Sequence, residues 1–409
     1  MAQNNASNQV LTSNMKTLIF VVALAGYAFG ASPLVERTLS HNYEIKAMQA
    51  EQHALKEEVD LSKSWDNPML ALGVDDIFFN EPLTRNQEMQ NESIAISQKI
   101  YTASKLDIKE SIALQNLAIK TLELKDKKLS LSKEIIALQY AFIRIENDLN
   151  ILAKYEKILH DLKEAHIAYN YTSPHYVDTL NNSVLQKNLF IEKKTLLKEK
   201  AVLLYKIQSI INETPIESLI QEAPKQKVFE GDALAFMLQN NPKLQIQNTI
   251  TKRELDNLHL EQASKTPDFT VSVGFKRRQG RDNYGFLSVE MPLPIYGREN
   301  LSIQKASLMK NASEQSALSL SNQLSFELQD ELLSKELVMD KIILTKEILH
   351  ENQRIYDNLS ATAFGQNDVL LSLLNNLIQT VETEIKLSTL NYQYQESLAK
   401  INYLLGVEL

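Results

Sequence analysis

The sequence predicts a mainly α-helical, elongated chain in which one helix–strand–strand–helix–helix unit occurs twice. Residues 101–166 contain no glycine or proline, and neither do residues 299–364. Each segment would form a helix on the order of 100 Å long at a rise of about 1.5 Å per residue. Shorter segments that alternate apolar and polar residues lie between the helical ones and predict β-strands. Helices of this length do not fit inside a compact domain, so we expect a long molecule.

Composition narrows the possible function classes. With only 10 glycines and 10 prolines in 409 residues, the chain is poor in the loops that most enzymes need. It carries a formal charge of -8 and no basic face, so we expect no nucleic-acid partner. The absence of cysteine excludes disulfides, thiolate metal ligands and a lipid-modified N-terminal cysteine. No phosphate loop, nucleophile motif or histidine pair at helical spacing is present, so we expect no enzyme, no cofactor and no resident metal.

Residues 1–30 are interpreted as an export signal. A lysine precedes an apolar run at residues 18–25, and small residues, the last of them Gly30, occupy the two positions that a signal peptidase reads. The run is too short for a membrane-spanning helix, so a retained anchor is the weaker interpretation. We expect cleavage after Gly30, with either Met1 or Met15 as the start of translation.

The remainder divides into two structural repeats, residues 31–220 and 221–409. Each repeat is expected to begin with one helix, at Pro33–Asp66 in the first and Asp232–Lys265 in the second. Two strands and two long helices follow. Their expected bounds are about 68–79, 91–99, 101–170 and 176–212 in the first repeat and about 268–278, 283–291, 298–364 and 367–405 in the second.

Matching residues support the duplication, because internal repeats mark structural units that pack against one another. The offset is the number of residues between matching positions in the two repeats. A four-residue difference in loop length would explain why this offset changes after the strands. The matched pairs are Asn42 with Asn241 at an offset of 199, Tyr101 with Tyr296 at 195, and Asn182 with Asn376 at 194.

The strand segments have two unlike faces. In the second repeat, apolar residues alternate with small or polar ones along residues 269–276. For an isolated hairpin, a soluble β-sandwich would account for this pattern. Together with an export signal, the small polar face suits a water-filled lumen and the apolar face suits lipid. Trp65, Tyr101 and Tyr296 lie near the strand ends, where aromatic rings suit either the membrane interface or ordinary packing.

Four strands are too few to close a membrane barrel, because the smallest such barrels have about eight. An open sheet also leaves two edges that only neighbouring copies can cover. Two copies would leave a lumen filled by side chains, whereas three would form a 12-stranded barrel with room for a passage.

The long helices need partners because their apolar stripes are continuous. Apolar residues recur at every seventh position from Leu117 to Leu159, and a second stripe runs from Leu370 to Ile385. Each repeat then reverses direction, at residues 169–175 and 361–368. These tips would lie about 100 Å from the strands.

The order of elements resembles the TolC family of outer-membrane efflux ducts over nearly the whole mature chain. Three segments carry the likeness: the strand exit at Val289–Arg298, the glycine-bearing tip at Phe364–Leu370 and the final helix at Leu398–Gly406. The resemblance implies a homotrimer whose 12-stranded β-barrel continues into a long periplasmic α-helical barrel. It also implies outer-membrane lipid, a periplasmic adaptor (membrane fusion) protein and an inner-membrane RND pump as partners.

The resemblance further implies a passive duct of a tripartite efflux system, which catalyses no reaction. Its compactness and the lack of a long C-terminal extension are more similar to the heavy-metal (cobalt-zinc-cadmium or copper-silver) branch, which favours metal cations as cargo. A drug-efflux or type I protein-secretion duct is the alternative within the family. A secreted coiled-coil scaffold is the alternative from another class.

The resemblance places the gate and the adaptor-docking site at the two periplasmic tips. Family tips often carry acidic residues just after the glycine turn, and Asp368 is the carboxylate nearest to that position. Asp178 is its counterpart in the first repeat, or else a carboxylate that the helix dipole favours at a helix start. The expected tip residues are Tyr171, Ser173, Pro174, Asp178, Phe364, Gly365, Gln366, Asn367 and Asp368.

Overall fold

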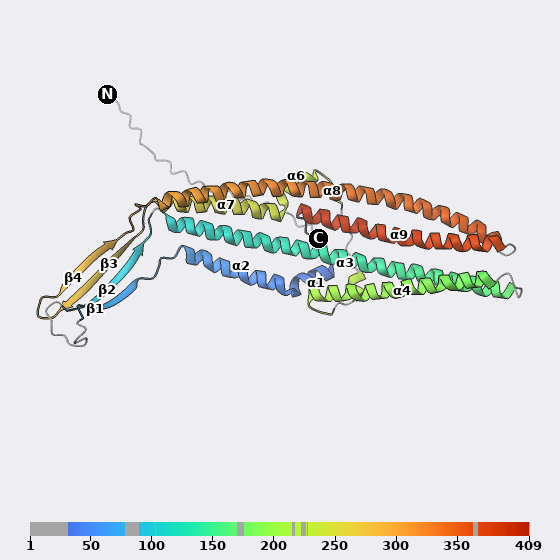
Figure 1. Ribbon diagram of the computed structural model, residues 1–409, viewed down its shortest axis with the longest axis horizontal. Helices are drawn as coiled ribbons and strands as arrows, with labels where there is room; N and C mark the ends of the chain where they lie inside the picture. Colours follow the sequence, from blue (N-terminus) through green and yellow to red (C-terminus); the bar gives the residue numbers. More distant parts are fainter. Residues whose placement is uncertain are drawn as a thin grey trace, which may run out of the picture.

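The computed structural model describes residues 32–77, 90–102, 104–169, 176–214, 217–221, 226, 228–362 and 367–408. The molecule is elongated, with a small β-sheet at one end and long helices that run from it to the opposite end (Figure 1). It is mainly α-helical and internally duplicated, as the sequence predicts. Among the described helices, none combines the length and apolar character that a membrane span requires.

The same order of elements occurs in both repeats, and the short helix α5 (Glu217–Gln221) lies between them. The first repeat contains α1 (Pro33–His41), α2 (Tyr43–Ser62), β1 (Met69–Asp75), β2 (Asn91–Ile100), α3 (Lys105–Tyr169) and α4 (Tyr176–Ile211). The second contains α6 (Ala233–Asn240), α7 (Pro242–Ala263), β3 (Phe269–Arg278), β4 (Tyr284–Glu290), α8 (Arg298–Thr362) and α9 (Asn367–Leu405).

An asparagine breaks the first helix of each repeat, so the expectation of one continuous helix there is wrong. Asn42 separates α1 from α2, and Asn241 separates α6 from α7. Each side-chain oxygen accepts a backbone N–H from the helix that follows. Each side-chain nitrogen donates over 2.8 Å to a carbonyl near the end of the last long helix of its repeat, Ile210 for Asn42 and Leu404 for Asn241. The buried asparagines thus cap one helix and hold another, which stabilises the break.

The structure corrects the alignment of the two hairpins. The ladder of β1 with β2 begins at Met69 opposite Ser97, and the ladder of β3 with β4 begins at Thr270 opposite Glu290. Both ladders contain seven pairs. Equating the first pairs of the two ladders places equivalent positions 201 residues apart in the first strand and 193 in the second. The pairing by itself also fits offsets of 199 and 195, so the helices that follow the strands decide between the two alignments.

Backbone conformation confirms the corrected alignment. Ser104 and Gly297 each have a positive φ immediately before a 65-residue helix, and they are 193 residues apart. Glycine adopts this left-handed conformation without strain. The sequence matches were misleading because α7 has 22 residues against 20 in α2, and because the second hairpin has a much shorter turn. The final helices keep the expected offset of 194, since Asn212 and Gly406 both follow them with positive φ.

Helix α3 lies at the centre of the helical part. It packs against α2 and α4 of its own repeat and against α7 and α9 of the other repeat. The heptad stripe supplies this packing, and its members Leu124, Leu131, Ile145, Leu152 and Leu159 are buried. Helix α8 packs mainly against α7 and α9, with Leu324 and Leu328 buried on that side. Its other side carries exposed apolar residues.

Candidate functional site

The four strands form one antiparallel sheet in the order β1-β2-β3-β4, and the pairing of β2 with β3 joins the two repeats. Along one row, Leu72 faces Ile94, and Ile94 faces Phe275. In the next row, Val273 faces Leu287. These five side chains are all exposed, Leu72 and Leu287 by 73% and 70%. One face of the sheet is therefore a continuous apolar surface in contact with the surroundings, which a soluble protein rarely exposes.

The opposite face carries mainly small and polar side chains, with the Phe286 ring as an exception. The hydroxyl oxygens of Ser97 on β2 and Ser272 on β3 lie 2.8 Å apart. Gly274 lies against the ring of Phe286, which fills the space that a Cβ atom would need. A sheet with these two faces can separate an apolar phase from water, which is the chemistry that a lipid-embedded wall requires.

Both outer edges of the sheet are free within the described residues. β1 pairs only with β2, and β4 pairs only with β3. Met291, Leu293 and Ile295 follow β4 and continue its alternation, and all three are exposed. Edges of this kind offer unpaired backbone N–H and C=O groups to another strand.

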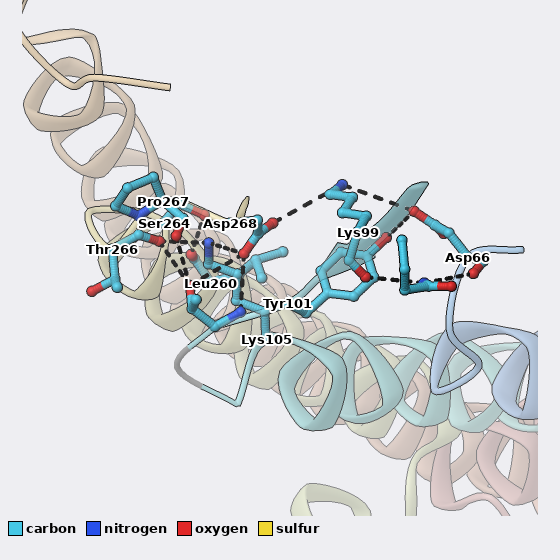
Figure 2. A network of polar contacts seen from close by, with 11 residues as sticks. Asp66, Lys99, Tyr101, Lys105, Leu260, Ser264, Thr266, Pro267 and Asp268 are labelled. Atoms are coloured by element: carbon cyan, nitrogen blue, oxygen red, sulfur yellow. Dashed lines mark hydrogen bonds and ion pairs between the residues drawn. The ribbon is translucent and has the colours of Figure 1, made fainter. Parts of the chain in front are cut away.

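A polar network connects the sheet to the helices (Figure 2). The Lys105 side chain at the start of α3 is only 6% exposed, and its Nζ donates to Asp268 Oδ1 over 2.7 Å and to the Thr266 carbonyl over 2.7 Å. The backbone N–H of Thr102 also donates to Asp268 Oδ1. Partial burial opposes ionisation of Asp268, but the hydrogen bonds from Lys105 and Thr102 outweigh it and lower the pKa of this carboxyl. The contact ties α3 of the first repeat to the start of β3 in the second.

Tyr101 extends the network toward β1. Its hydroxyl donates to Asp66 Oδ2 over 2.7 Å, and the ammonium groups of Lys99 and Lys109 lie 4.5 and 4.4 Å from its ring centroid. The hydrogen bond to Asp66, together with partial burial, raises the pKa of Tyr101 to about 12. This tyrosine is therefore held by polar packing at the junction, whereas Trp65 is 54% exposed.

Helices α3 and α8 end, and α4 and α9 begin, at the end of the molecule opposite to the sheet (Figure 1). Asp178 belongs to α4, and Asn367 and Asp368 are the first residues of α9, but the positions of these three side chains are outside the description. The tip assignment stays a prediction, as does the signal cleavage. The residues of these predictions that lie outside the described ranges are Gly30, Tyr171, Ser173, Pro174, Phe364, Gly365 and Gln366.

Sequence reasoning did not find the junction network. Lys105 and Asp268 are 163 residues apart, and no spacing pattern links them. The available signal was the concentration of charged residues where the strands meet the helices, but such residues are usually solvated. Among the described residues, no group of three or more histidines or carboxylates is placed to hold a metal ion.

Comparison with solved structures identifies the architecture. No protein-family model and no curated protein sequence matches the chain. The outer membrane channel MtrE of Neisseria gonorrhoeae, in its open state, matches with a TM-score of 0.79 at 12% identity, over 92% of this chain and 89% of that one. This chain has the fold of an outer-membrane channel.

Two further channels share this fold. The outer membrane protein VceC of Vibrio cholerae matches with a TM-score of 0.74 at 13% identity, over 91% of this chain and 95% of that one. The outer membrane channel CmeC of Campylobacter jejuni gives 0.72 at 11% identity, over 91% and 84%. At these identities the likeness concerns the outer-membrane channel fold alone.

Proposed function

We propose that this protein is the outer-membrane duct of a tripartite efflux system, a homotrimer that exports substrate without catalysing a reaction. The observation that carries the proposal is the sheet with one exposed apolar face and one small polar face. In the proposed assembly the apolar face contacts outer-membrane lipid and the polar face lines the water-filled lumen. Three copies of a four-stranded sheet supply the strands of a 12-stranded barrel.

The helical part forms the periplasmic barrel in this proposal. The helix ends opposite to the sheet would meet a periplasmic adaptor protein and an inner-membrane RND pump, which supplies the energy. Metal cations are the favoured cargo, on the likeness of the sequence to the heavy-metal branch. A drug-efflux or type I protein-secretion duct would share the architecture and differ in partners and cargo.

Lysine substitutions on the two faces of β4 test the membrane assignment. Leu287→Lys puts a charge on the lipid-facing side, where it should cost about 2 kcal/mol and sharply reduce the protein recovered in outer membranes. Ser288→Lys, one residue further along, points to the lumen and should assemble normally.

The mass of the assembly tests the proposed homotrimer. Light scattering in detergent should give three protomers of about 43 kDa each, the 46.5 kDa chain less its signal.

A secreted coiled-coil scaffold gives a different result. On a solvent-exposed sheet, Leu287→Lys would leave yield and solubility unchanged or improve them. Equal recovery of the two lysine variants, or a monomer that keeps its β-sheet signal, would therefore contradict the proposed duct.

Charge at the periplasmic tips is expected to control which ions pass. Replacing both Asp178 and Asp368 by asparagine should lower the preference of single channels for cations in planar bilayers, because carboxylates in a narrow ring concentrate cations. The matched control replaces both by glutamate, which conserves the charge and should conserve the cation preference. If the asparagine variant loses thermal stability while conductance and selectivity stay the same, the two residues only cap helices.

A further inference from the structure

A cleft of about 590 Å³ lies at the junction between the sheet and the helices. Residues of β2, β3 and β4 line it, together with residues at the adjoining ends of α3, α7 and α8. Its volume is typical of sites for small organic molecules. Apolar contacts are available from Met291, Pro292 and Pro294, which follow β4. We call this site the junction cleft.

The junction cleft belongs to the face of the sheet that carries small and polar side chains. Lys99 of β2, Thr270 of β3 and Glu290 of β4 line the cleft and form one row of directly opposite residues. Successive side chains of a strand alternate between faces, so this row shares the face of Ser97 and Ser272, which are two residues away in their strands. The proposed duct turns this face to the lumen. Any role of the cleft in transport therefore rests on the proposed function.

One side of the cleft carries two ammonium groups beside a single carboxylate. Asp268 accepts from Lys105 Nζ through Oδ1 over 2.7 Å, and its Oδ2 lies 4.0 Å from Lys99 Nζ (Figure 2). Lys99 approaches Asp66 no closer, at 4.0 Å. The buried Lys105 ammonium donates two of its three hydrogens, to Asp268 and to the Thr266 carbonyl. Both ammonium groups therefore retain a hydrogen that an anionic group of a ligand can accept.

The other side carries two carboxylates that form no ion pair with a described residue. Glu290 is the last residue of β4, Glu299 lies in the first turn of α8, and both line the cleft. They do not make a metal site, because no group of three or more histidines or carboxylates in the described part of the chain is placed to hold an ion. The cleft thus presents separate positive and negative groups in a volume that suits an organic molecule.

We propose that the junction cleft binds an organic zwitterion whose two charged groups are separated by up to about 10 Å. Lys99 and Lys105 hold its anionic group, and Glu290 and Glu299 hold its cationic group. Lys99 and Glu290 lie on the strands to either side of β3, so their backbones are two strand spacings, or about 10 Å, apart. A ligand with one kind of charge would leave the opposite groups of the cleft unpartnered, and charged groups removed from water need partners. Such a cargo fits the drug-efflux alternative of the proposed duct better than metal cations do.

Fluorescence titration of the extracted protein with norfloxacin, in a buffer free of divalent cations, tests the site. This rigid aromatic molecule is fluorescent, and at neutral pH it carries a carboxylate and an ammonium group at opposite ends. Its N-acetyl derivative has only the carboxylate, and its ethyl ester has only the ammonium group. Norfloxacin should bind about tenfold more tightly than either derivative, because each derivative lacks one set of charge-assisted hydrogen bonds with the cleft.

Substitutions in the cleft should change the order of affinities according to charge. In the double variant Glu290→Gln with Glu299→Gln, norfloxacin should bind no more tightly than its N-acetyl derivative. In Lys99→Gln, its advantage over the ethyl ester should shrink, with Lys105 still in place. The control Glu351→Gln removes an exposed carboxylate of α8 outside the cleft and should keep the natural order of affinities.

The natural protein alone can overturn the proposed site, through equal affinities for the three molecules or tighter binding of either derivative. An order of affinities that both cleft variants leave unchanged would overturn it as well. Light scattering of the same samples separates this site from the proposed duct. A trimer that does not discriminate among the three molecules keeps the duct and loses the site, whereas a monomer that discriminates keeps the site and loses the duct.

Discussion

Valine in place of Gly274 is expected to prevent normal formation of the sheet, at a cost of about 3 kcal/mol. A Cβ atom at this position would meet the Phe286 ring and would lie 2.8 Å from the carbonyl oxygen of Ile94. The ring can rotate away, but the carbonyl belongs to β2 and moves only if the pairing of β2 with β3 is disturbed. The amount of assembled protein in outer membranes, and the β signal of the extracted protein, should both fall.

Gly285 provides the matched control, because it lies on the neighbouring strand and faces Phe275. The nearest atom to a Cβ atom there is the Gly274 carbonyl oxygen at 3.6 Å, which is an ordinary contact. Gly285→Val should therefore change stability by no more than about 0.5 kcal/mol. Equal damage by the two substitutions would mean that loss of glycine in a strand, and not the close approach to Ile94, limits assembly.

Replacing Asp268 by alanine is expected to destabilise the junction between sheet and helices by about 3 kcal/mol, because the Lys105 ammonium is left buried without its counter-charge. The loss should appear as a lower midpoint in thermal unfolding of the extracted protein, followed by circular dichroism. Lys105→Met combined with Asp268→Leu removes both charges and should recover much of the stability. The exposed pair of Arg354 with Glu351 is the control, since Glu351→Ala should cost between 0 and about 1 kcal/mol.

The contribution of Asp268 should also depend on pH. Its pKa is lower in the folded chain than in the unfolded one, so the stabilisation is complete above the unfolded value of about 3.9 and is lost as pH falls through the folded value. The difference in unfolding midpoint between the natural protein and Asp268→Ala should therefore be constant from pH 5 to 7 and shrink below about pH 4. A difference that persists unchanged in acid would show that packing, and not charge, explains the loss.

The helical part of the fold was largely predictable because it depends on local periodicity. The stripe from Leu117 to Leu159 predicts a long helix with a partner along its length, and five of its members are buried in α3. The alternation along residues 269–276 likewise predicts a strand with two unlike faces. The breaks at Asn42 and Asn241 were missed because an asparagine within a helical pattern need not end the helix, and the sequence does not show that each side-chain nitrogen donates to a carbonyl of a distant helix.

The candidate site was predictable only in part. Asn42 and Asn241 marked the duplication, but the match of Tyr101 with Tyr296 misplaced the second strands by two residues. Helix α7 is longer than α2, whereas the turn of the second hairpin is shorter than that of the first. These length differences partly cancel in the residue numbers, so an alignment by identical residues could not locate them. The residues of the two tips, Tyr171 to Asp178 in the first repeat and Phe364 to Asp368 in the second, remain predictions. Their side chains lie outside the described part of the chain.

The sequence by itself determined that this protein is long, duplicated and helical, with strands that are apolar on one face, because each of these properties follows from residues close together in the chain. The tertiary structure alone decided the pairing of β2 with β3, which places β1 and β4 at the ends of the strand order, and the burial of Lys105 beside Asp268. These features join segments more than 150 residues apart. Which distant groups meet depends on how whole helices and hairpins pack, and no short-range pattern records it.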